Sequence, residues 1–143
     1  MTELTYEEYL EKNGSMTYSN VGTSMMPLLK QGRDLFTVTK KGSERCRKYD
    51  VVLYRRPPDK YVLHRVVKVR ENDYVILGDN CINKEYGITD DDILGVMTSF
   101  VHKGKQHTVN DMTYRIYSHL WVDLSFFRVN LKKLRMKIKR KRK

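Results

Sequence analysis

The sequence predicts a mainly β protein with a short N-terminal helix and a C-terminal amphipathic helix. Three observations support this prediction. Residues 35–101 hold short β-branched and aromatic runs separated by turn-forming residues, the pattern of hairpin-linked strands. Residues 5–13 carry helix-capping signals, and residues 111–143 contain neither Gly nor Pro. We therefore expect one domain at 1–110, followed by a basic amphipathic helix and tail at 111–143.

The N-terminal helix is predicted over residues 5–13. Thr5 and Glu8 have the spacing of a capping box, in which the hydroxyl accepts a first-turn amide. Gly14 is a natural stop, because glycine readily adopts the left-handed conformation that ends helices. The strands are expected at 35–38, 51–54, 61–69, 74–77 and 93–101, joined by turns at 41–43, 57–59, 71–73 and 103–104.

The C-terminal helix has an apolar stripe at alternating spacings of three and four. We expect the part from Tyr117 to Phe127 to pack on the sheet, and the part from Leu131 to Lys143 to act at a surface. An apolar stripe beside Lys and Arg suits an anionic membrane surface, so residues 128–143 are the expected contact. Nucleic acid is less favoured, since the tail lacks interleaved aromatic residues. The stripe consists of Tyr117, Leu120, Leu124, Phe127, Leu131, Leu134 and Ile138.

Charge and length limit the function classes. The 143 residues are enough for one domain with a core, and the formal net charge is +11. Ten of the 28 Lys and Arg lie in 128–143, where there is no acid, so the body is nearly neutral. No signal peptide or spanning segment is predicted. Cys46 and Cys81 are expected to be free thiols, although the sequence does not exclude a disulfide between them. These features favour a cytoplasmic protein, including one held at the inner membrane surface.

The segment 21–27 (VGTSMMP) has the features of a turn that presents a nucleophile. A serine hydroxyl reacts poorly until a base takes its proton, so Ser24 requires partners. Gly22 and Thr23 shape the turn, and an amide near Ser24 could point at a developing oxyanion. Met25 is suited to anchor the turn in the core. Most serines in such turns have no chemical role.

His64 and Asp79 are the candidate partners. His64 lies within the apolar alternation of the strand at 61–69, which would hold its ring rigidly. Asp79 directly follows the strand at 74–77 and could equally stabilise a plain turn. Each residue alone is better explained by a structural role, but a serine, a histidine and an aspartate in three such settings together favour catalysis. His102, His107 and His119 lack a comparable setting, and no metal or organic cofactor is expected.

Six segments in this order resemble the conserved boxes of the S24/S26 serine peptidases, the superfamily of signal peptidases and self-cleaving SOS-type repressors. The resemblance spans residues 20–97, and the segments are GTSMMP at 22–27, GRD at 32–34, DVVLY at 50–54, HRVV at 64–67, GDN at 78–80 and ILGV at 93–96. His at position 64, followed by Arg, is closest to the archaeal and endoplasmic-reticulum type; bacterial relatives use Lys there. Met26 departs from the acidic residue common in the archaeal type.

This resemblance implies the signal peptidase fold and a serine endopeptidase. Ser24 would be the nucleophile and His64 the general base, while Asp79 would orient the imidazole. Glu85 or one of Asp90, Asp91 and Asp92 is the alternative acid. The substrate would be a peptide or leader sequence bound as an extended strand.

Two other functions are compatible with the sequence. The chain could cut itself once, as the repressors do, although residues 1–20 are too few for a helix-turn-helix. It could instead be a non-catalytic module that binds membrane or nucleic acid through its basic tail.

Overall fold

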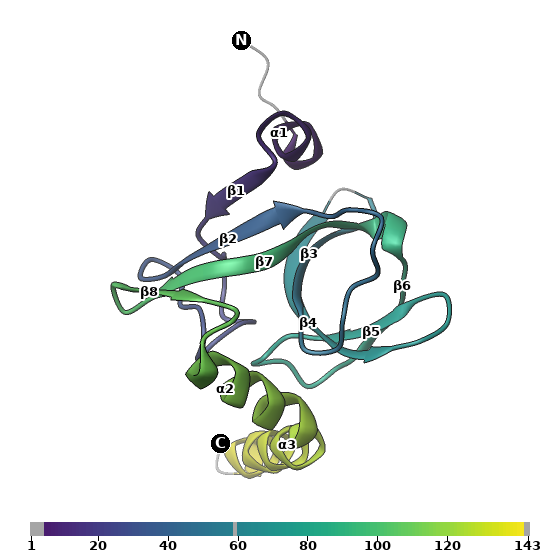
Figure 1. The fold of residues 1–143 in the computed structure, drawn as a ribbon. Coiled ribbons are helices and arrows are strands. Elements are labelled where there is room, and N and C mark those ends of the chain that lie inside the picture. Colours follow the sequence, from purple (N-terminus) through teal and green to yellow (C-terminus); the bar gives the residue numbers. More distant parts are fainter. Residues whose placement is uncertain (1–4, 59, 142–143) are drawn as a thin grey trace.

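The computed structural model describes residues 5–58 and 60–141. Its central element is one eight-stranded antiparallel sheet with the order β1-β2-β7-β3-β4-β5-β6, and β8 pairs with β7. Figure 1 shows α1 at one end of the sheet, above β1, and the two C-terminal helices at the opposite end. The protein is therefore mixed α and β, with an antiparallel sheet as its largest part. The strands are β1 (Ser15–Tyr18), β2 (Leu35–Lys40), β3 (Val51–Arg56), β4 (Lys60–Val69), β5 (Tyr74–Leu77), β6 (Glu85–Ile88), β7 (Ile93–His102) and β8 (Lys105–Thr108).

The five predicted strands are all present, and three further strands were not predicted. β1, β6 and β8 are only four residues long. β6 contains Gly87 at a positive φ, and β8 is polar throughout, so neither has the apolar alternation that marks a strand. Their pairing depends on neighbouring strands rather than on their own composition.

The first helix, α1 (Tyr6–Asn13), is confirmed with its caps. The Thr5 hydroxyl accepts the amide of Glu8 at 3.1 Å, and Gly14 ends the helix with φ 78°. Leu10 is 1% exposed and joins the core. α1 therefore covers one end of the sheet, as expected.

The predicted C-terminal helix is two helices, α2 (Met112–Asp123) and α3 (Ser125–Lys141), separated at Leu124. The expected packing of the stripe from Tyr117 to Phe127 is found at Tyr117, which packs against the core, but is wrong for Leu120, Leu124 and Phe127. α2 instead buries Tyr114, Ser118 and Val122, while Leu120, Leu124 and Phe127 are exposed. The buried face includes a serine that hydrogen-bonds a buried arginine, so hydrophobic periodicity alone pointed to the wrong side of the helix.

Two apolar clusters lie on opposite faces of β3, because successive side chains of a strand alternate. Val51 and Leu53 belong to the cluster that contains Leu10 of α1 and Met25. Val52 and Tyr54 belong to the second cluster, which also contains Val66 of β4 and Ile76 of β5. All four side chains are buried, so β3 is covered on both faces. Asp59, in the predicted turn at 57–59, and residues 142–143 of the predicted basic tail lie outside the described residues.

Candidate functional site

Ser24 lies half-buried in the turn that follows β1. Gly22 adopts φ 87°, which side chains rarely tolerate, and a Cβ there would meet nothing within 4 Å. The glycine is therefore needed for the backbone conformation, not for a close approach. The Gly22 amide donates to Gln31 Oε1 at 2.7 Å, and so it stabilises the turn instead of pointing at an oxyanion. Met25 is fully buried and anchors the turn, as expected.

The turn at residues 78–81 brings Ser24 and His64 together. A Cβ built on Gly78 would lie 2.8 Å from the Ser24 carbonyl oxygen and 2.9 Å from His64 Nε2. Only glycine permits so close an approach of a turn to another backbone and a ring. The Asn80 amide donates to the Ser24 carbonyl at 2.8 Å, and the Asn80 side chain donates to the Thr23 carbonyl at 3.0 Å. Ser24 is thus held by hydrogen bonds from the segment that also contacts His64.

His64 projects from β4 beside Tyr54 of β3. The strand register places Val52 opposite His64 and Tyr54 opposite Val62, so Tyr54 and His64 are diagonal neighbours on one face. His64 Nδ1 lies 3.3 Å from the Tyr54 hydroxyl, which donates to Glu85 Oε1 at 2.9 Å. Because the tyrosine proton is directed to Glu85, its oxygen accepts from Nδ1–H of the histidine. The other ring nitrogen, Nε2, is then unprotonated and faces the Ser24 segment.

The electrostatics of this relay favour a neutral imidazole. Burial and the positive charge of Arg56 lower the pKa of His64 to about 4, although Glu85 and Asp79 act in the opposite direction. Burial would raise the pKa of Glu85, but hydrogen bonds from Arg56 and Tyr54 hold it below its usual range. Arg56 Nη2 lies 2.6 Å from Glu85 Oε1. Glu85 is therefore an ionised acceptor near neutral pH, and Nε2 can take a proton.

Asp79 has a different set of partners. Its carboxylate forms a bidentate ion pair with Arg65, at 2.8 Å and 2.9 Å, and accepts the Tyr117 hydroxyl at 2.8 Å. Both side chains of the ion pair are 1% exposed. Arg65 also donates to the Tyr114 and Ser118 hydroxyls of α2. Asp79 therefore fixes the 78–81 turn and α2, and the carboxylate connected to His64 by hydrogen bonds is Glu85.

Cys81 and Tyr54 are two residues of this site that the sequence analysis did not assign. Cys81 Sγ lies 4.0 Å from His64 Nε2 and 3.9 Å from the Ser24 carbonyl. Burial raises the pKa of the Cys81 thiol despite the nearby Lys132, so it is protonated near pH 7 and weakly nucleophilic. Tyr54 lies two residues from the position opposite His64, so its place beside His64 follows from the strand register and not from the sequence alone. Both cysteines are free thiols.

A cavity of about 390 Å³ opens at Ser24 and His64. One wall is the segment from Tyr18 to Val21, and another is the beginning of β4. β4 pairs with β3 from Lys60 onward but with β5 only from Arg65 onward. Among the described residues, no strand pairs with the other edge of residues 62–64, so an extended peptide could add a strand there, next to the cavity.

The remaining candidates lie elsewhere. Asp90 accepts the Tyr74 hydroxyl and pairs with Lys41 and Arg45, and Asp92 caps the short 3-10 helix Asp90–Asp92 through Thr89. None of these contacts reaches His64, and Asp91 has no described contact with the site. The other three histidines make contacts away from the site. His119 stacks on Tyr49 and His107 stacks on Phe100, and His102 Nδ1 lies 2.8 Å from the Leu28 carbonyl oxygen.

Within residues 5–58 and 60–141, no group of three or more His, Cys, Asp or Glu is placed to hold a metal ion. In the same part of the chain, no helix is long and apolar enough to cross a membrane. A scan against protein-family models gave no match, and searches of curated proteins and of solved structures gave none either.

Proposed function

We propose that this chain is a serine endopeptidase of the signal peptidase type, in which Ser24 attacks a peptide bond and His64 is the general base. The observation that carries this proposal is the convergence at Gly78. The Ser24 segment, His64 Nε2 and the 78–81 turn meet at one point beside an open strand edge, although they come from three distant segments.

In the proposed reaction, Ser24 Oγ adds to the substrate carbonyl carbon while His64 Nε2 accepts its proton. The imidazolium then returns this proton to the leaving amine, which gives an acyl-enzyme on Ser24, and water hydrolyses the ester by the same base. Glu85, acting through Tyr54, keeps the proton of the resting imidazole on Nδ1 and stabilises the positive charge that develops. No step requires a metal or organic cofactor.

The proposed substrate is an extended peptide paired with the edge of residues 62–64 that faces away from β3. Main-chain hydrogen bonds would provide affinity, and the cavity beside Ser24 would accept one or two side chains. Such binding places the scissile bond where the edge reaches His64. This position agrees with the register of β4, which pairs with β5 only from Arg65 onward.

The test is cleavage of a mixed peptide library, read by mass spectrometry, with four proteins. The wild type and Cys81→Ala should cut at the same sites, whereas Ser24→Ala and His64→Asn should show no cutting above background. Cys81→Ala is the matched control, because Cys81 also contacts His64. Unchanged cleavage by Ser24→Ala would overturn the mechanism. Loss of cleavage in Cys81→Ala alone would identify the Cys81 thiol, and not Ser24, as the nucleophile.

A further inference from the structure

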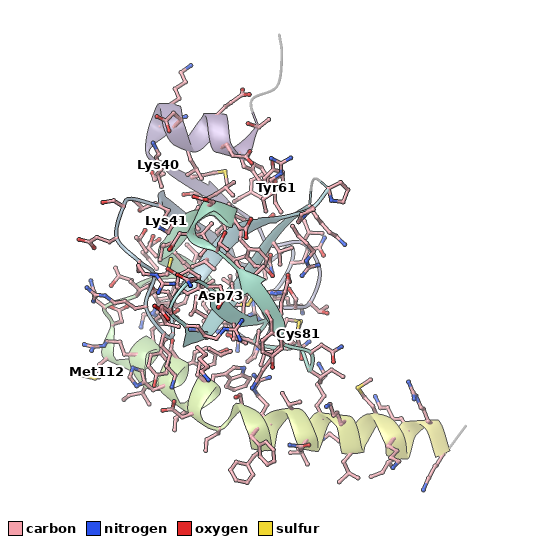
Figure 2. All side chains as sticks on the ribbon, turned by 90° about the vertical axis from the view of Figure 1, so that its right-hand side faces the viewer. Lys40, Lys41, Tyr61, Asp73, Cys81 and Met112 are labelled. Carbon is pink, nitrogen blue, oxygen red and sulfur yellow. The ribbon has the colours of Figure 1, made fainter. Side chains whose placement is uncertain are left out.

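Helix α3 extends away from the body of the protein as a cationic rod (Figure 2). Its 17 residues include eight Lys or Arg and no acid, and none of its residues is buried. Only one side approaches the body, through Ser125, Arg128, Val129 and Lys132, which are half-buried. These residues recur at the spacing of one helical face. The rest of the helix surface is available to a partner.

An apolar stripe runs along the available surface of α3. Its side chains are between 44% and 69% exposed, and they recur at spacings of three and four residues. All of its residues except Leu134 line a groove of about 1090 Å³, to which α2 also contributes Leu120 and Trp121. So much contiguous apolar surface is unusual on a protein that has no partner there. The stripe consists of Leu124, Phe127, Leu131, Leu134 and Ile138.

Cations border this stripe on both sides. At 3.6 residues per turn, Arg135 and Lys139 lie along one side, and Lys137 and Lys141 lie along the other. Within residues 5–58 and 60–141, no carboxylate forms an ion pair with a Lys or Arg of α3. The positive charge of the helix is therefore not neutralised by the described part of its own chain.

We propose that α3 lies on an anionic lipid surface, with the stripe in the interface and the flanking cations among the headgroups. Charge complementarity selects this occupant. A second copy of the chain would bring two such helices together and oppose like charges along both sides. An RNA would neutralise the cations but would leave the apolar stripe in water. An anionic lipid interface satisfies both parts of the helix.

The attachment of α3 places the proposed peptidase site beside that surface. Arg128 Nη1 donates to the Asp79 carbonyl at 2.8 Å, and Trp121 Nε1 of α2 donates to the same oxygen at 2.7 Å. Lys132 Nζ donates to Asn80, both to its carbonyl and to Oδ1. Asp79 and Asn80 form the turn that holds Ser24. The lipid contact itself does not depend on the catalytic proposal.

The experiment is co-sedimentation of the full chain with vesicles of phosphatidylglycerol and phosphatidylcholine, compared with vesicles of phosphatidylcholine alone. We expect binding to the anionic vesicles and a decrease of about tenfold in Leu134→Glu, which places a carboxylate in the stripe. Met112→Glu is the matched control. Met112 is also an exposed apolar residue, 68% against 53% for Leu134, but it lies at the far end of α2. This variant should bind as the wild type does.

Three results would overturn the proposal. The first is equal binding of Leu134→Glu and the wild type. The second is binding to a single-stranded RNA that displaces the vesicles and is unaffected by Leu134→Glu, which would assign the cations to nucleic acid. The third is a concentration-dependent dimer that Leu134→Glu dissociates, together with no vesicle binding, which would assign the stripe to a second copy. Far-UV circular dichroism of each variant establishes that α3 is retained.

Discussion

Two hydrogen-bonded networks meet at the 78–81 turn, one through Asp79 and the other through His64 beside Gly78, and they differ in burial and in the residues they hold in place. In the network of Arg65, Asp79 and Tyr117, the ion pair is almost completely excluded from solvent and Tyr117 of α2 is half-buried, so the network joins the sheet to α2. The network of His64, Tyr54, Glu85 and Arg56 is partly open, and the Glu85 side chain is 24% exposed. Each contains a carboxylate, a tyrosine and an arginine. The difference suggests a division of roles, in which the first network stabilises the fold while the second fixes the tautomer of His64.

The largest expected difference between the networks is in stability. Asp79→Asn leaves the buried Arg65 without its counter-charge and should lower the free energy of unfolding by about 3–5 kcal/mol. Glu85→Gln, in a partly exposed pair, should cost about 1 kcal/mol or less. Urea denaturation of both variants measures this. Equal losses would show that the two carboxylates contribute equally to the free energy of unfolding, which would contradict the difference between the networks.

The second prediction concerns pH. The pKa of His64 is about 4 when folded and about 6.5 in the unfolded chain, so the unfolded state binds more protons between these values. The wild type should therefore lose about 3 kcal/mol of stability from this residue as pH falls from 7 to 4. His64→Gln should lack that part of the decrease. Denaturation curves of both proteins at the two pH values give the difference, and parallel losses would contradict the buried neutral imidazole.

The third prediction targets the turn between the networks. Gly78→Ala adds a Cβ that would lie under 3 Å from a backbone oxygen, a ring nitrogen and the Cys81 sulfur. We expect a stability loss of about 1–3 kcal/mol and a larger loss of peptide cleavage, because the turn must move away from Ser24 and His64. Gly42→Ala is the control, since a Cβ there meets nothing within 4 Å. Unchanged cleavage by Gly78→Ala would separate this turn from the site.

The smallest expected effects come from two matched hydroxyl deletions. Tyr117→Phe and Tyr54→Phe each remove one hydrogen bond to a carboxylate, at 2.8 Å and 2.9 Å. Each should cost about 1 kcal/mol of stability. Only Tyr54→Phe should also lower kcat, because it disconnects His64 from Glu85. Kinetics with a cleaved peptide distinguishes the two variants. A comparable loss of kcat in Tyr117→Phe would contradict the idea that only the network of Tyr54 acts on His64.

The sequence predicted the strands that have apolar alternation and missed those that depend on their neighbours. The strand at 61–69 was predicted because its own pattern is strong, whereas β6 and β8 have no such pattern. The C-terminal segment shows a limit of periodicity. Its strongest apolar stripe is exposed. The face that packs includes Ser118, whose buried hydroxyl accepts a hydrogen bond from Arg65.

For the candidate site, the order of motifs indicated Ser24 and His64 but could not assign the acid. Asp79 and Glu85 were both candidates for the acid, because separation along the sequence does not reveal which carboxylate forms an ion pair with an arginine. Arg65 takes Asp79, and Tyr54 connects Glu85 to His64. Tyr54 was inside a recognised motif without an assigned role. Its position relative to His64 follows from strand register, which requires the fold.

The hydrogen bonds between α3 and the 78–81 turn have a consequence for protein engineering. The Asp79 and Asn80 carbonyls accept hydrogen bonds from Trp121, Arg128 and Lys132, so α2 and α3 satisfy the backbone acceptors of this turn. A replacement terminal segment grafted after β8 would need an indole, a guanidinium and an amine in the same places. A transplant of the sheet that keeps these hydrogen bonds therefore has to include the chain as far as Lys132.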